Sequence, residues 1–197
     1  MDIFKKCKAT VDAVNYAKSI NIYPYFTPIE SAQDHRVIIG GREYIMIGSN
    51  GYLGLAADER LKKTAIDAIQ KYGSTCSGSR FLNGTLDIHI KLEKELADFF
   101  EKDSAIVFST GFQTNLGIIS AIAGKDDVII IDRQNHASII DGCRLSFAEV
   151  KKFKHNDMAD LERILKSIPH NKGKLIIVDG VFSMEGDVIN LPKVVEL

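Results

Sequence analysis

The segment FSTGFQTN, residues 108–115, has the residue types of a phosphate-binding turn. Its pattern predicts a strand that ends at Ser109 and a turn at Gly111 and Phe112. A helix is then predicted from about Thr114. Such a junction directs backbone N–H groups and the positive end of a helix at one point, which suits an anion, and glycine lets the backbone approach that anion closely. Many strand–turn–helix junctions share these features, so the segment alone does not establish phosphate binding.

His136 lies in DRQNHASIIDG, residues 132–142, just after a predicted strand. Ligands of open α/β sheets bind at the carboxyl ends of the strands. An imidazole at that edge could stack on a flat heteroaromatic ring. The alternative is a histidine that caps the following helix or is solvated.

Asp179 and Ser183 follow another predicted strand, in DGVFSMEGD, residues 179–187. Both would reach the same carboxyl edge, and Glu185 and Gly186 are typical of a turn. The alternatives are that Asp179 only caps and that Ser183 bonds within its own loop. Together with the two preceding segments, these residues would place a phosphate cradle, an imidazole and a hydroxyl at one sheet edge.

Asn50 lies in a fourth candidate segment, SNGYLGL, residues 49–55, where two glycines suggest a tight loop. The segment marks a change of pattern, and we expect a domain boundary there. Residues 1–48 are predicted to form an N-terminal arm with a helix at 2–20 and a hairpin of strands 37–39 and 44–47. Residues 49–197 are predicted to be part of a larger α/β domain.

Helices and strands alternate over most of that larger part. A helix is predicted from Asp58 to Tyr72, stopped by Gly73, and another from a cap at Thr85 to Phe100. Strands alternating with helices indicate right-handed βαβ units and a mostly parallel sheet. The predicted strands are 105–109, 128–132, 150–154 and 175–180, and the predicted helices are 114–123, 135–145 and 157–168. A last helix has only begun at LPKVVEL, so we expect the chain to be a truncated domain.

The composition is that of a globular protein, with 197 residues, 45% hydrophobic, and a net charge of −1. The small net charge gives no electrostatic footprint for nucleic acid. No apolar run approaches the roughly 20 residues that span a bilayer, and three distant cysteines fit a reducing cytoplasm. No metal site is predicted. A nicotinamide-dependent dehydrogenase would suit the alternating pattern, but its G-x-G-x-x-G fingerprint is missing.

Taken together, these segments resemble the α-oxoamine synthase family, pyridoxal-phosphate enzymes of fold type I. The resemblance runs from about Tyr23 to Leu197. Within the family, GSRFLNGTLDIH, FSTGFQTNLG, NHASIIDGCRLSF and DGVFSMEGDVINLP are most similar to the bacterial serine palmitoyltransferase branch. The resemblance implies the first half of the aminotransferase-like large domain. It also implies a cytoplasmic homodimer that condenses an amino acid, serine first, with an acyl-CoA and releases carbon dioxide.

The resemblance also implies roles for single residues. Gly111 and Phe112 match the turn that holds the cofactor phosphate, and His136 matches the histidine stacked on the pyridine ring near the substrate carboxylate. Ser183 matches a serine that hydrogen-bonds the cofactor. Segments that line the substrate site in the family match Asn50 and the loop of Ser79, Arg80 and Phe81.

One departure from the family is large, because its members are roughly twice as long. By the resemblance, the Schiff-base lysine, the aspartate that pairs with the ring nitrogen and the carboxylate-binding arginine would follow Leu197. Lys125, Lys154 and Lys174 match no such motif. We therefore expect the chain alone to be inactive. The alternatives are another α-oxoamine synthase, either 2-amino-3-ketobutyrate CoA ligase or 8-amino-7-oxononanoate synthase, and a non-catalytic partner subunit.

Overall fold

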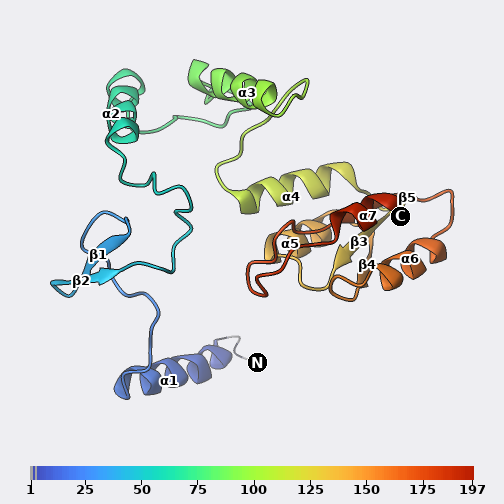
Figure 1. Cartoon of the computed structure of the whole chain (residues 1–197), viewed down its shortest axis with the longest axis horizontal. Helices are drawn as coiled ribbons and strands as arrows, with labels where there is room; N and C mark the ends of the chain where they lie inside the picture. The colour runs from blue at the N-terminus through green and yellow to red at the C-terminus, as the bar shows by residue number, and fades with distance from the viewer. Residues whose placement is uncertain (1, 3) are drawn as a thin grey trace. The chain divides into compact units, whose positions relative to one another are not determined.

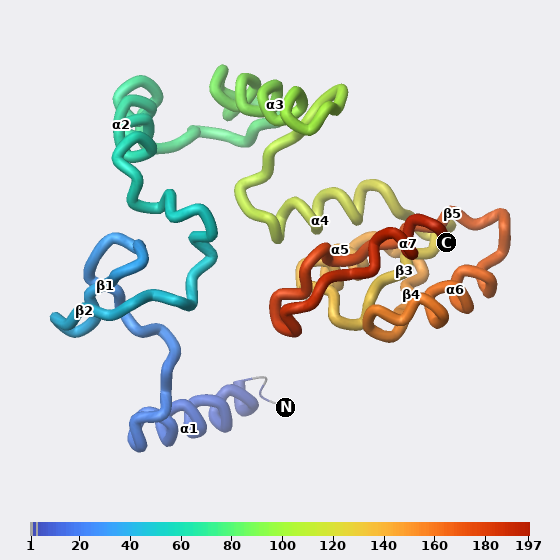
Figure 2. Tube along the Cα trace, viewed as in Figure 1, coloured from blue at the N-terminus to red at the C-terminus, as the bar shows by residue number. Residues whose placement is uncertain are grey.

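A computed structural model describes residue 2 and residues 4–197, and it divides the chain into two compact units, Met1–Gly84 and Thr85–Leu197. The division differs from the predicted boundary between residues 48 and 49, and that boundary stays a prediction. Helix α2 (Glu59–Tyr72) belongs to the first unit, although none of its residues is buried. Figures 1 and 2 follow the chain through both units, which are described separately below.

The first unit contains the predicted helix and hairpin of the arm. Strands β1 and β2 pair antiparallel around Gly40 and Gly41, whose φ angles of 56° and 72° are those of a turn that favours glycine. Gly73 ends α2 with a φ of 80°, as predicted, and the Asp58 side chain caps its start by accepting from Arg60 N. The elements of this unit are α1 (Lys5–Ser19), β1 (Arg36–Ile39), β2 (Arg42–Ile45) and α2 (Glu59–Tyr72).

The second unit is built on a parallel sheet in which β3 lies between β4 and β5. The α/β fold with a parallel sheet is therefore confirmed. The Asp157 side chain caps the start of α6 (Met158–Ser167) by accepting a hydrogen bond from Asp160 N. The elements are α3 (Asp87–Phe99), α4 (Gly111–Ile122), β3 (Asp127–Asp132), α5 (Ala137–Leu145), β4 (Glu149–Phe153), α6 (Met158–Ser167), β5 (Gly173–Ile177) and α7 (Leu191–Glu196).

Strand β3 is buried on both faces, because its side chains alternate between two cores. Ile129 and Ile131 pack with residues of α4 and α5 on one face. Val128 and Ile130 pack with residues of α6 and α7 on the other. The sheet thus lies between two layers of helices (Figure 1).

The strand predicted at 105–109 is not present. A strand needs a hydrogen-bonding neighbour, and among the described residues none pairs with this segment. The N–H of Val107 instead donates to Glu93 Oε1 at 2.9 Å, and Ile106 is exposed. The run has the right composition for a strand but no neighbouring strand in the described chain.

Two predicted helix starts are also corrected. Helix α4 begins at Gly111 and not near Thr114, because Thr110 caps it by accepting from Gln113 N at 3.1 Å. Gly111 and Phe112 are therefore the first helical residues and not a separate turn. Helix α3 has Leu86 rather than Thr85 at its cap position, where His89 Nδ1 accepts from Leu86 N at 2.9 Å.

Candidate active site

A pocket of about 500 Å³ lies where β3 and β5 end. This is the carboxyl edge of the sheet, where open α/β folds bind ligands. His136, Asp179 and Ser183 all line it, so residues predicted from two separate segments share one cavity. The remaining lining residues are Gln134, Asn135, Ala137, Val181, Met184 and Glu185.

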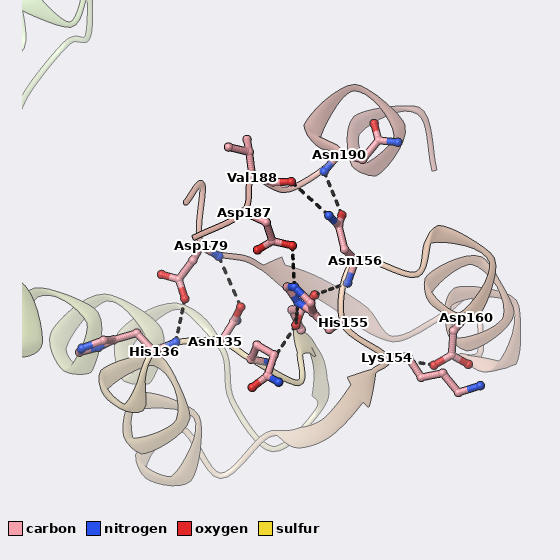
Figure 3. A network of polar contacts seen from close by, with 12 residues as sticks. Asn135, His136, Lys154, His155, Asn156, Asp160, Asp179, Asp187, Val188 and Asn190 are labelled. Atoms are coloured by element: carbon pink, nitrogen blue, oxygen red, sulfur yellow. Dashed lines mark hydrogen bonds and ion pairs between the residues drawn. The ribbon is translucent and has the colours of Figure 1, made fainter. Parts of the chain in front are cut away.

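Asn135 and Asp179 join the two strand ends beneath this pocket. The amide of Asn135, a buried side chain, donates to Ile177 O at 2.7 Å. The Asp179 carboxylate accepts from the backbone N–H of His136 at 2.7 Å (Figure 3). These hydrogen bonds join the backbone segments on the two sides of the pocket, so Asp179 does more than cap its own loop.

The His136 side chain caps α5, which agrees with the alternative interpretation left open by the sequence. Its Nδ1 accepts from Ser138 N at 3.2 Å and lies 2.7 Å from Ser138 Oγ. Asn115 of α4 in turn donates to that hydroxyl at 2.8 Å. Capping uses only Nδ1, so the rest of the exposed ring is available to a ligand in the pocket.

The N-terminus of α4 lies beside His136. The ring of Phe112 meets the imidazole edge-on, with 6.4 Å between centroids. The first N–H groups of a helix have no intrahelical acceptor, and a Cβ added at Gly111 would meet nothing within 4 Å. The approach to these N–H groups is therefore open, in the way an anion site requires.

Ser183 lies at the tip of a closed loop that follows β5. Val181 and Val188 form an antiparallel bridge at its base, and Phe182 is buried below it. Gly186 has a φ of 73°, and its N–H donates to Phe182 O at 2.8 Å. The predicted turn at 185–186 is present, and it exposes Ser183 to the pocket.

His155, which no sequence pattern singled out, holds this loop to the sheet. Its Nδ1 lies 3.0 Å from Asp132 Oδ1. Its Nε2 lies 2.9 Å from Asp187 Oδ2 (Figure 3). The Asp132 side chain is fully buried. Its hydrogen bond to the imidazole is the main reason that the pKa of His155 is raised, with Asp187 adding to the effect and partial burial opposing it.

Three further hydrogen bonds, all made by Asn156, complete this attachment. Asn156 N donates to Asp132 Oδ2 at 2.8 Å, and its side-chain amide donates to Val188 O at 3.1 Å. The N–H of Asn190 donates back to Asn156 Oδ1 at 3.0 Å.

The structure thus places Gly111, Phe112, His136 and Ser183 in the second unit, with contacts that link α4 to His136 and a pocket shared by His136 and Ser183. Asn50, Ser79 and Arg80 lie in the first unit. Their role as substrate-lining residues stays a prediction.

No lysine is among the described residues that line the pocket. Lys125, Lys154 and Lys174, which match no lysine motif of the family, are exposed. Within residues 2 and 4–197, no group of three His, Cys, Asp or Glu side chains could hold a metal ion. In the same residues, no helix has the length and apolar character needed to cross a membrane.

The sequence profile of the aminotransferase class I and II family matches residues 42–197. The chain therefore belongs to this family, and its fold is that of the fold type I aminotransferases. The Sphingobacterium spiritivorum serine palmitoyltransferase is 54% identical over 184 residues, which are 93% of this chain and 46% of that protein. The 8-amino-7-oxononanoate synthase of Thermoanaerobacter pseudethanolicus is 49% identical over 181 residues, 91% of this chain and 46% of that protein.

Solved structures give the same picture. The serine palmitoyltransferase of Sphingomonas wittichii matches with a TM-score of 0.95 and 37% identity, over 100% of this chain and 50% of that one. A point variant of the S. paucimobilis enzyme, with a bound PLP–myriocin aldimine, matches with a TM-score of 0.95 and 36% identity over the same shares. The chain spans about half the length of the relatives it matches.

Proposed function

We propose that this chain supplies part of the active site of a pyridoxal-phosphate-dependent acyltransferase. The proposed reaction condenses serine with a long-chain acyl-CoA and releases carbon dioxide, as a step of sphingolipid biosynthesis in the cytoplasm. One observation carries the proposal: in a member of this family, His136 and Ser183 line one pocket at the carboxyl edge of the sheet. Three relatives that are 53–54% identical are named serine palmitoyltransferase, which supports the choice of serine.

The residues present fit pyridoxal phosphate. A pocket of about 500 Å³ is within the range that small-molecule sites occupy. The open space at Gly111 leaves the first N–H groups of α4 accessible to a phosphate. An exposed imidazole and an exposed hydroxyl, those of His136 and Ser183, are groups that can stack on a pyridine ring and hydrogen-bond its substituents.

Each residue then has a distinct task. Gly111 and Phe112 would hold the phosphate through their backbone N–H groups, and His136 would cover one face of the ring and bind the amino-acid carboxylate. Ser183 would hydrogen-bond the cofactor from the opposite strand end. The bound cofactor supplies an electron sink for the negative charge that develops at the amino-acid α-carbon.

Binding of pyridoxal phosphate to the full chain tests the proposal, followed by absorbance and by 31P NMR of the phosphate. His136→Ala should weaken binding about fivefold, because one aromatic stacking contact contributes about 1 kcal/mol beyond area burial. Ser120→Ala is the matched control, since this exposed hydroxyl bonds only within α4. Binding that is absent, or equally strong in both variants, would exclude the proposed site.

We further propose that the chain by itself does not turn over. Among residues that the structure describes, no lysine lines the pocket, so none of them is placed to bond the cofactor or remove the α-proton. Borohydride reduction of the chain with pyridoxal phosphate, followed by mass spectrometry, should give no stoichiometric adduct at one lysine. A single fully labelled lysine would contradict this.

A second candidate is another α-oxoamine synthase, and the 49% identity to an 8-amino-7-oxononanoate synthase favours it over more distant chemistry. Co-expression with the part of the Sphingobacterium spiritivorum relative that the chain does not cover would reconstitute a testable enzyme. Serine with a long acyl-CoA should then be used in preference to glycine with a short one.

We also propose a homodimer, which sedimentation of the reconstituted enzyme would test. Co-purification with a separate full-length homologue would instead indicate a non-catalytic partner subunit.

A further inference from the structure

His136 is held by contacts from three directions. Its backbone N–H donates to Asp179 at 2.7 Å, which fixes the main chain. Its Nδ1 receives the Ser138 backbone N–H at 3.2 Å and lies 2.7 Å from the Ser138 hydroxyl. Asn115 approaches that hydroxyl from α4 at 2.8 Å. Ser138 is buried, so its hydroxyl group is removed from water on this side of the exposed imidazole.

The chemistry of these donors determines where the imidazole proton resides. A backbone N–H can only donate, so Nδ1 must accept from Ser138 N. The Asn115 amide nitrogen also only donates, and it occupies a lone pair of Ser138 Oγ. The hydroxyl proton of Ser138 is then directed at Nδ1. Both donors require an unprotonated Nδ1, and the proton of the neutral ring lies on Nε2.

We propose that Asn115 and Ser138 are positioning residues that fix His136 as its Nε2–H tautomer. Nε2 lies across the ring from the capped nitrogen, which leaves an N–H donor for an anionic group in the pocket. That group is the carboxylate of the amino-acid substrate, and this assignment rests on the proposed function. With the opposite tautomer, Nε2 would present a lone pair and repel a carboxylate.

Reversing one hydrogen bond provides the sharpest test. In Asn115→Asp, the carboxylate accepts the Ser138 hydroxyl proton, so Ser138 Oγ presents a lone pair to His136 and favours a proton on Nδ1. In Ser138→Ala one of the two donors to Nδ1 is lost. Gln113→Glu is the matched control, because it adds the same charge to an exposed position of the same helix.

The measurement is long-range 1H–15N correlation on the full chain with labelled histidine, at a pH where the rings are neutral. The His136→Gln variant assigns the signal among the five histidines. We expect the wild-type ratio of Nε2–H to Nδ1–H to exceed about ten, since two hydrogen bonds select it. Asn115→Asp should lower this ratio about tenfold and Ser138→Ala severalfold, with no change in Gln113→Glu.

A wild-type signal from the Nδ1–H tautomer would overturn the inference directly, even if a variant failed to fold. So would an equal ratio in wild type and Asn115→Asp, or an equal shift in Gln113→Glu. Pyridoxal phosphate binding measured in parallel separates the two proposals. If pyridoxal phosphate binds while His136 is the Nδ1–H tautomer, only the proposed role of Asn115 and Ser138 fails. If His136 is the Nε2–H tautomer but pyridoxal phosphate does not bind, only the cofactor assignment fails.

Discussion

Replacing His155 by glutamine should loosen the loop that carries Ser183. The imidazole bonds the fully buried Asp132 at 3.0 Å, and such a charge-assisted bond contributes about 2 kcal/mol. Its edge-on contact with the Phe182 ring, at 4.5 Å between centroids, adds about 1 kcal/mol. The bond to Asp187 adds less, because that side chain is 43% exposed. The free energy of unfolding should fall by about 3 kcal/mol.

The same substitution should remove a pH dependence of stability. The hydrogen bond to Asp132 raises the pKa of His155 above its ordinary value of 6.5. The protonated ring therefore stabilises the fold fully below pH 6.5, and this contribution is lost as the pH rises through the higher folded-state pKa. Neutral imidazole has one proton and cannot donate to both carboxylates. The difference between wild type and His155→Gln should be larger at pH 6 than at pH 9.

Urea denaturation followed by circular dichroism at both pH values measures this difference, and limited proteolysis reports on residues 181–188. His35→Gln is the matched control, because His35 bonds its neighbour Asp34 with 78% of its side chain exposed. That variant should unfold like wild type. Equal midpoints for wild type and His155→Gln, or the same pH dependence in both, would refute the role assigned to the network.

Two further predictions concern the interior of the second unit. Ile130→Ala should lower the free energy of unfolding by about 2–4 kcal/mol, because Ile130 is fully buried in the core on the face of the sheet that packs with α6 and α7. Ile45→Ala, at a residue 72% exposed, should change it little, and equal urea midpoints for the two variants would contradict the assigned core. Cys143 is buried, and burial raises the pKa of its thiol, so a thiol reagent should label Cys7 and Cys76 within minutes and Cys143 only on unfolding. Labelling of all three at one rate in the native chain would disprove this.

Much of the fold could be predicted because its signals are local. The apolar run of β3 identifies a strand buried on both faces, and Gly73 and Asp157 set helix ends through their own backbone and side-chain preferences. The segment 105–109 has the same local signal. A strand also depends on a neighbour supplied from elsewhere, and sequence pattern contains no information about that neighbour.

The candidate site shows the same division. His136 and Ser183 could be found because each follows a predicted strand, and parallel strands end at one edge. The role of His155 could not, since its partners Asp132 and Asp187 lie 23 and 32 positions away in the chain. A histidine in a polar loop gives no sign of which carboxylates will approach it. The cap that His136 forms with Ser138 was predictable as an alternative, whereas its extension to Asn115 was not.

Because the base of the Ser183 loop is closed, residues at its tip can be substituted without disturbing the base. The Val181–Val188 bridge and the buried ring of Phe182 anchor both ends, while Met184 and Glu185 face the pocket without entering either core. Selection can therefore alter the wall of the pocket by changing two or three tip residues, with the scaffold left intact. For protein engineering, this makes the tip a natural position for a small randomised library aimed at substrate preference.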